Sequence, residues 1–394
     1  MLGLQFPTDH TKIQLDIVGL LAIVGESAMA DHVQPATNSR ASLIPRLVPA
    51  PQSFLRTDRP WKLPPNTTAR VVGIHSGNYS SDLNYFPNIL HGIDELPRFT
   101  VRTISITRPQ MPGNEAGAVA PVRNITVRRF GPMNVLTIVG MLFFIGLLTA
   151  AIVLHDGMAL IALVLLALTS SIVSLGSLWS VDLPRRKSQR IQIPNGDVVV
   201  IGHQGSFLVV RCGEDIAREL YFARERCKYV VGDRLFQVIA ATGTFMFMAS
   251  VVFLANGSWN LQASIGLSYI ILNGLYWMAG LLPARLQWDL SGYEVKEEKF
   301  EKAGDYTATL MNAIRITRAV KWLRISAAVP ETDKWDKWLG EALDRVHDKG
   351  WDGHKILTEV LSDAPSPPPN VPSQAALRHS RFGRGSHPED IDDD

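Results

Sequence analysis

Four long runs without a charged residue limit most strongly what this chain can fold into. They cover residues 133–154, 158–179, 236–255 and 259–282. A helix of about 20 residues, rising 1.5 Å per residue, crosses the roughly 30 Å of hydrocarbon in a bilayer. Only three residues separate the two runs of each pair, so we expect two tight helical hairpins. The runs therefore predict an all-α polytopic membrane protein with four transmembrane helices.

Composition favours a membrane protein and argues against a nucleic-acid partner. The 394 residues are 46% hydrophobic with a mean hydropathy of +0.08, which is high for a soluble protein. The 39 lysines and arginines nearly balance the 37 aspartates and glutamates. No strong positive field is therefore available to attract a polyanion, and the lipid bilayer is the first partner that we expect.

The two cysteines, Cys212 and Cys227, are too few for a disulfide-stapled scaffold. Together with His203 they would still lack one ligand of a tetrahedral zinc site. We therefore expect reduced structural thiols, no metal site and no cofactor.

The distribution of basic residues predicts the orientation of the helices. Thirteen lysines and arginines precede the first run, ten lie between the second and third, and sixteen follow the fourth. Neither short turn contains one. Because Lys and Arg are retained on the cytosolic side during insertion, we expect a multi-pass membrane protein with both termini in the cytosol. The organelle stays open.

Residues 1–30 form an apolar leader with three interpretations. The run 17–25 precedes Ala28 and Ala30, which resemble the small residues of a signal-peptidase site. The leader is a signal peptide, a short fifth span, or a helix that lies in the membrane interface. Cleavage would place the region after it in the lumen. Three sequons would then be available for glycans, at Asn66, Asn78 and Asn124.

Residues 31–132 contain thirteen prolines, which leave few windows in which a helix can propagate. We expect this region to be largely irregular. Partial alternation of apolar and polar residues predicts one strand over 99–107, and 70–74 is a second strand candidate.

Residues 180–235 predict a small cytosolic α+β module. The β-branched run 198–201 and the run 207–210 flank a turn and describe a hairpin, while 215–222 has helical spacing. A lone hairpin is marginal in water. It should therefore pack on that helix, on the bilayer surface or on the C-terminal region.

Residues 283–362 predict a helical cytosolic region, and the composition of 363–394 is typical of a disordered tail. A basic helix over 305–328 lies either on anionic headgroups or against the rest of the protein with a solvated face. Two further helices follow from apolar residues at helical spacing. They carry Trp335, Trp338, Leu339, Ala342, Leu343 and Val346, and then Ile356, Leu357, Val360 and Leu361.

The four apolar runs contain no Asp, Glu, Lys, Arg or His, residues that transporters and proton pumps usually keep within their spans. The best candidate for a polar contact inside the membrane is Asn273, with Tyr269 and Tyr276 nearby, and we interpret it as an interhelical hydrogen bond. Small residues at close spacing predict tight helix packing or self-association. They are Ala167, Ser170, Ser171, Ser174, Ser264 and Ser268.

No constellation in the sequence points to an enzyme. It contains no phosphate-binding glycine loop, His-Glu-x-x-His motif or nucleophile elbow. His347 or His354 could pair with Asp344, Asp348 or Asp352, which we interpret as a surface hydrogen bond. We expect a non-enzymatic membrane scaffold or accessory subunit, with a homo-oligomeric or other membrane-protein partner. The alternative is a facilitator or channel for a small or uncharged solute.

Three short segments carry a resemblance. They read Gly205-Ser-Phe-Leu-Val-Val-Arg-Cys, Ile216-Ala-Arg-Glu-Leu-Tyr-Phe and Ile271-Leu-Asn-Gly-Leu-Tyr-Trp. In these segments the chain resembles uncharacterised multi-pass membrane proteins of filamentous fungi, over roughly residues 129–361. The resemblance implies the two-hairpin architecture and an intracellular middle module. It implies no activity, ligand or catalytic residue.

Overall fold

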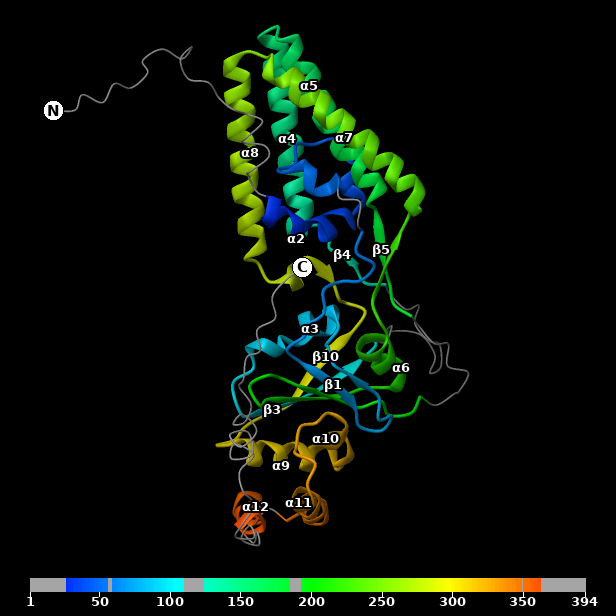
Figure 1. Ribbon diagram of the computed structural model, residues 1–394, viewed down its shortest axis with the longest axis vertical. Coiled ribbons are helices and arrows are strands. Elements are labelled where there is room, and N and C mark those ends of the chain that lie inside the picture. Colours follow the sequence, from blue (N-terminus) through cyan, green and yellow to red (C-terminus); the bar gives the residue numbers. More distant parts are fainter. Residues whose placement is uncertain (1–25, 56–58, 110–123, 185–192, 349, 363–394) are drawn as a thin grey trace, which may run out of the picture.

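The computed structural model describes residues 26–55, 59–109, 124–184, 193–348 and 350–362. Along its longest axis lie a helical bundle, a mixed β-sheet and a final layer of helices (Figure 1). The apolar leader, apart from its last five residues, and the tail 363–394 lie outside the described residues.

Two helical hairpins form the bundle. They consist of α4 (Pro132–Val153) with α5 (Gly157–Gly176), and α7 (Asp233–Ala255) with α8 (Trp259–Gly280). Asp156 connects their turns, because its carboxylate accepts hydrogen bonds from the Ala159 amide at 3.0 Å and the Ser258 amide at 2.6 Å. Both hairpins thus turn at one end of the bundle. Their open ends meet at the other end, which we call the foot.

The expectation of an all-α protein with four transmembrane helices is wrong. Helices make up 54% of the described residues, and a six-stranded mixed sheet accompanies them. Three of the described helices, α4, α5 and α7, are long and apolar enough to cross a membrane, which suggests a membrane protein. α8 has 22 residues, but Asn260, Gln262 and Asn273 lower its hydropathy below that of the other three.

The sheet combines strands from distant parts of the chain. Its order is β10-β3-β7-β6-β1-β2, and of these neighbours only β3 and β7 run parallel. The predicted hairpin is confirmed as β6 and β7, and the predicted strands at 70–74 and 99–107 as β1 and β3. The strands are β1 (Arg70–Gly73), β2 (Tyr79–Ser80), β3 (Thr100–Thr107), β6 (Val198–Ile201), β7 (Phe207–Arg211) and β10 (Glu294–Lys302).

Residues 31–132, which we expected to be largely irregular, hold three strands of this sheet and several short helices. The short strands fit between successive prolines, whereas α2 and α3 contain Pro35 and Pro87. Proline spacing alone therefore does not exclude such elements. The remaining described elements that begin in or overlap this region are α2 (Glu26–Thr37), η2 (Arg40–Leu43), η3 (Pro51–Leu55), α3 (Tyr85–His91), η4 (Ile93–Glu95) and β4 (Thr126–Val127).

Helices cover both faces of the sheet. In β6, Val198 and Val200 belong to one hydrophobic core, while Val199 and Ile201 belong to the other. A strand buried on both faces reads as a continuous apolar run, as this one does. The face toward the bundle is covered by α3, α6 (Glu214–Ile216) and the π-helical turn η5 (Ala217–Phe222).

The opposite face is covered by the C-terminal helices α9 (Tyr306–Thr317) and α10 (Lys321–Ile325). The helix expected over 305–328 is interrupted, because Arg318 adopts a left-handed φ of 51° and ends α9. Leu310 and Ile314 of α9 are buried against the sheet. This helix therefore packs on the side of the sheet away from the bundle (Figure 1), and not on membrane headgroups.

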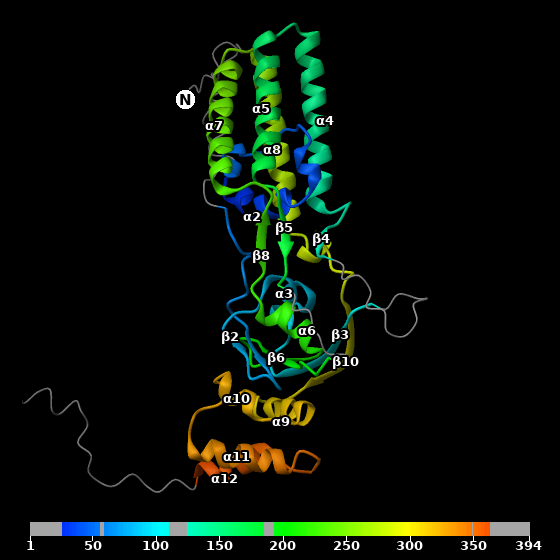
Figure 2. The ribbon, with the colours of Figure 1, turned by 90° about the vertical axis from the view of Figure 1, so that its right-hand side faces the viewer.

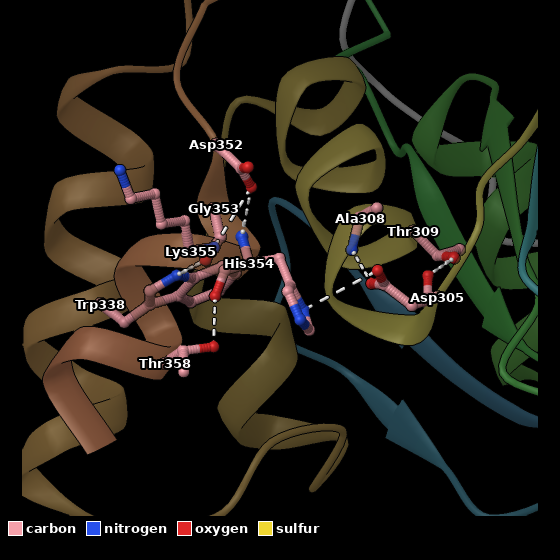
Figure 3. Close-up of polar contacts among 9 residues, drawn as sticks. All are labelled: Asp305, Ala308, Thr309, Trp338, Asp352, Gly353, His354, Lys355 and Thr358. Carbon is pink, nitrogen blue, oxygen red and sulfur yellow. Dashed lines mark hydrogen bonds and ion pairs between the residues drawn. The ribbon is translucent and has the colours of Figure 1, made fainter. Parts of the chain in front are cut away.

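The last two helices, α11 (Asp333–Asp344) and α12 (Gly353–Ser362), pack beneath α9. Figure 3 shows their junction, in which the Trp338 indole donates to the Gly353 carbonyl at 2.9 Å. Asp352 caps α12 by accepting hydrogen bonds from the amides of His354 and Lys355.

Two short ribbons connect the bundle to the sheet (Figure 2). β5 (Trp179–Asp182) pairs with β8 (Arg226–Tyr229) below α5 and α7. β4 pairs with β9 (Trp288–Asp289), which follows α8 and the short helix η6 (Ala284–Leu286). The buried rings of Trp179 and Trp288 bring the two ribbons together, with centroids 6.1 Å apart.

Residues 40–55, which we call the inserted segment, enter the lower half of the bundle. The Leu47 amide donates to the Gly140 carbonyl of α4 at 3.3 Å. A Cβ atom at Gly140 would lie 2.5 Å from the Leu47 carbonyl oxygen, so the two backbones meet where only glycine fits. Irregular backbone is tolerated at such a depth because protein surrounds it.

We expect Gly140→Ala to lower the stability of the bundle by about 1 to 3 kcal/mol, because backbone atoms must shift to admit the methyl group. Gly146→Ala in the same helix is the matched control, since nothing lies within 4 Å of its Cβ position. The thermal midpoints of the two detergent-solubilised variants measure the difference. Equal midpoints would contradict the close approach.

Candidate functional site

The three residues expected to form an intramembrane polar contact lie on α8 but do not form one group. Tyr269 is buried in the core formed with α4 and α5. Asn273 is half-buried, and its Oδ1 has no hydrogen-bond partner among the described residues. Tyr276 is buried in a second core, nearer the foot, with Val48 of the inserted segment.

Tyr276 meets a buried arginine that sequence reasoning missed. The Tyr276 hydroxyl lies beside the guanidinium of Arg46, which is 1% exposed. The Arg46 Nη1 donates to the carbonyls of Ser42 and Ile44, while Nε and Nη2 have no partner in the described part of the chain. The His32 ring lies 6.1 Å from the Tyr276 ring.

The small residues of α5 face the inserted segment as well as neighbouring helices. Ser170 donates to the Arg46 carbonyl at 2.9 Å, and Ser174 is buried with its hydroxyl unpartnered among the described residues. Ala167 is also buried and accepts a hydrogen bond from Ser171 at 3.3 Å. On α5, therefore, small side chains make room for a third stretch of chain.

On α8 the two predicted packing residues bond within their own helix. Ser264 is exposed and donates to Asn260, and Ser268 is buried and donates to Ser264. Close approach of α5 and α7 instead occurs at glycines. A Cβ at Gly243 would lie 2.6 Å from a methyl carbon of Val173.

A sequence signal for Arg46 does exist. It is the only charged residue in 41–55, a stretch otherwise made of apolar residues, proline, serine and one glutamine. A single arginine in such a run is typical of a buried, functionally or structurally constrained charge. The many prolines around Arg46 instead predicted irregular structure, which is usually exposed and not buried.

Buried ionisable groups in the sheet domain form two structural networks. His91 Nε2 and the Tyr221 hydroxyl are 2.6 Å apart, and burial lowers the pKa of His91 to about 3, so its ring is neutral. Glu219 is buried and bonds to Arg108 at 2.6 Å and to the Tyr293 hydroxyl at 2.9 Å. The first contact joins α3 to the π-helical turn, and the second joins that turn to residues that flank β3 and β10.

The cysteines and C-terminal histidines do not assemble a reactive centre. Burial raises the pKa of Cys212 and of Cys227 to about 12, so both thiols stay protonated. The His354 ring lies 3.8 Å from Asp305, at the start of α9, while its backbone amide donates to Asp352 (Figure 3). Within the described ranges, no three His, Cys, Asp or Glu side chains are grouped to hold a metal ion.

Glu225 is the buried carboxyl with the most unusual titration. Its two oxygens accept the amides of Tyr85 and Phe86, each at 3.0 Å, at the start of α3. Burial raises its pKa from 4.5 to about 7 even though the two amides lower it. The carboxyl is thus protonated in the folded protein over a range where the unfolded chain is already ionised.

This shift predicts that stability falls as pH rises. The contribution of Glu225 is fully present below its unfolded pKa of 4.5 and is lost as pH passes its folded pKa of about 7. The loss is at most about 3 kcal/mol. Thermal midpoints between pH 5 and pH 8 should vary less in Glu225→Gln than in the wild type. Glu95→Gln, an exposed control, should keep the wild-type dependence, and an unchanged slope in Glu225→Gln would contradict the assignment.

Comparisons with known proteins identify no relative of this chain. No protein-family model matches the chain, and neither a curated protein nor a solved structure shows significant similarity to it. The likeness to fungal multi-pass membrane proteins therefore stays a prediction.

Proposed function

We propose that this chain is a non-enzymatic membrane scaffold or accessory subunit. The observation that carries the proposal is that its own inserted segment fills the lower bundle. Leu47 is 1% exposed there, among side chains of α4, α5 and α8. The inserted segment occupies space that a solute path through a single copy would need. A role as a membrane anchor therefore fits the bundle better than a role as a channel.

A stiff junction at the foot supports the same role. The Arg59 guanidinium donates to the carbonyls of Gly176 at 3.0 Å and Val231 at 2.8 Å, at the end of α5 and just before α7. It also pairs with Asp233 and lies 4.3 Å from the ring centres of both Tyr229 and Phe236. Such a multiply bonded arginine holds the chain that leads into the sheet domain against the foot of the bundle.

The foot of the bundle is proposed to face the cytosol, with the sheet domain and both termini. The basic residues favour this orientation, because all of them lie outside the two turns at the far end. The hairpins also return the chain to the foot after α5 and after α8. A scaffold oriented in this way presents its folded surface to cytosolic partners.

Protease protection in sealed microsomes tests this orientation. We expect a tag inserted beside Gln204, in the β6–β7 turn, to be digested, and a tag beside Gly257, between α7 and α8, to be protected. The reverse pattern would contradict the proposed orientation. As the folding control, each tagged chain should keep the thermal midpoint of the untagged chain.

One observation favours a second candidate function, a facilitator for a small uncharged solute formed by several copies. The half-buried Asn273 amide oxygen lacks a partner among the described residues. A polar group left unpaired in an apolar region is stabilised when another chain or a solute bonds to it. Flux measurements separate this candidate from the scaffold.

We expect liposomes containing the full chain to take up glycerol and urea no faster than empty liposomes in stopped-flow light scattering. Flux that is lost in Asn273→Leu and kept in Ser264→Ala would overturn the scaffold in favour of the facilitator.

Photocrosslinking in native membranes tests the scaffold directly. A photocrosslinking residue at Phe300 of β10, which is 48% exposed, should give a discrete adduct with another protein. The same probe at Phe245 of α7 should give none, because the proposed scaffold contacts partners through its sheet domain.

A further inference from the structure

An apolar groove runs along the foot of the bundle between α4 and α8. Its volume is about 680 Å³, within the roughly 300 to 1,000 Å³ typical of ligand sites. The first turn of α4, the last two turns of α8 and the helix η6 form its walls. The apolar side chains that line it include Phe130, Val135, Leu275, Met278, Leu282 and Leu286.

The groove is open along its side and is not a closed cavity. Phe130 is 84% exposed, and Met278 and Leu282 are 50% and 47% exposed. Large apolar side chains gathered on a surface mark a site for a membrane or another apolar partner. α4 is one of the helices apolar enough to cross a bilayer. In a bilayer, the first turn of such a helix would lie at the level of the lipid headgroups.

Two consecutive arginines, Arg128 and Arg129, line the same groove at its mouth. Both are exposed. The Arg128 Nε donates to the Trp288 carbonyl at 3.0 Å. Within the described residues, the Arg129 guanidinium has neither a hydrogen bond nor an ion pair, although the Arg129 backbone carbonyl is bonded. No carboxylate is among the described residues that line the groove. The described lining at the mouth is therefore positively charged.

The backbone that carries these arginines is held in place. The buried Asn134 amide donates to the carbonyls of Arg128 and Arg129, at 3.0 and 3.2 Å. The buried Gln287 binds the same turn, because its Oε1 accepts the Met133 amide and its carbonyl accepts the Arg128 amide. A fixed backbone reduces the ordering that a ligand must impose on the arginines.

We infer that this groove binds one anionic phospholipid of the surrounding bilayer. The lipid phosphate contacts Arg128 and Arg129, and an acyl chain lies along the apolar walls. Guanidinium groups bind phosphate through paired hydrogen bonds, and the cytosolic leaflet supplies anionic lipids. The inference rests on membrane embedding with the foot toward the cytosol, and it holds for either proposed function.

The test uses the full chain in nanodiscs and a fluorescent phosphatidylserine as probe. Replacing Arg129 with Gln should weaken binding about fivefold, and Arg128→Gln/Arg129→Gln further, since each basic residue contributes about that factor. Arg234→Gln, an exposed arginine at the start of α7, is the charge-matched control and should bind as the wild type does. Binding of phosphatidylcholine, which carries no net charge, should not differ between the wild type and the variants.

A second variant tests the apolar part of the site. Ala279→Phe places a ring in the groove without changing charge, and it should reduce phosphatidylserine binding while the thermal midpoint stays near that of the wild type. Unchanged binding in Ala279→Phe, or equal losses in Arg129→Gln and Arg234→Gln, would overturn the proposal. Inorganic phosphate that binds as tightly as the lipid would also overturn it, because the ligand would then be a free anion. None of these readouts depends on solute flux or on crosslinking.

Discussion

The architecture depends on how the chain crosses the foot of the bundle. Here four helix ends, two ribbons and the segment before them must share a small space while their backbone groups stay bonded. Gln287 caps the start of α4 and donates to the Pro35 carbonyl at 3.4 Å. Arg59 donates to the carbonyl of Gly176 at the end of α5 and to that of Val231 just before α7. These two side chains bond the chain around the foot to the ends of α4 and α5.

The same constraint gives the molecule its proposed use. Two ribbons tie the sheet domain to the bundle. In the proposed scaffold, this connection would limit how the sheet domain turns relative to the helices. The charged strand β10 lies at one edge of that sheet. Lys and Glu along an edge oppose pairing with strands of other molecules. A partner is then expected to recognise side chains on this domain more than its free backbone edge.

The buried polar groups divide between two tasks. In the sheet domain, His91 bonds to the π-helical turn, Glu225 to the start of α3, and Glu219 to Tyr293 just before β10. In the bundle, Arg46 anchors the inserted segment although part of its guanidinium lacks a partner in the described chain. A buried charge with incomplete bonding contributes little to stability, and we interpret Arg46 as a residue that favours one arrangement of the inserted segment.

The sequence by itself determined the elements that local spacing defines. Uncharged runs specified α4, α5 and α7 and the positions of their turns, β-branched residues specified β6 and β7, and helical stripes specified α11 and α12. Tertiary structure decided the rest. β10 carries seven charged residues among its nine and shows no apolar alternation, and it becomes a strand because β3, almost two hundred residues earlier, offers a partner. The inserted segment is buried for a similar reason, because it bonds to Gly140 of α4 and Ser170 of α5, which lie far along the chain. The local periodicity of a sequence cannot predict contacts between such distant residues.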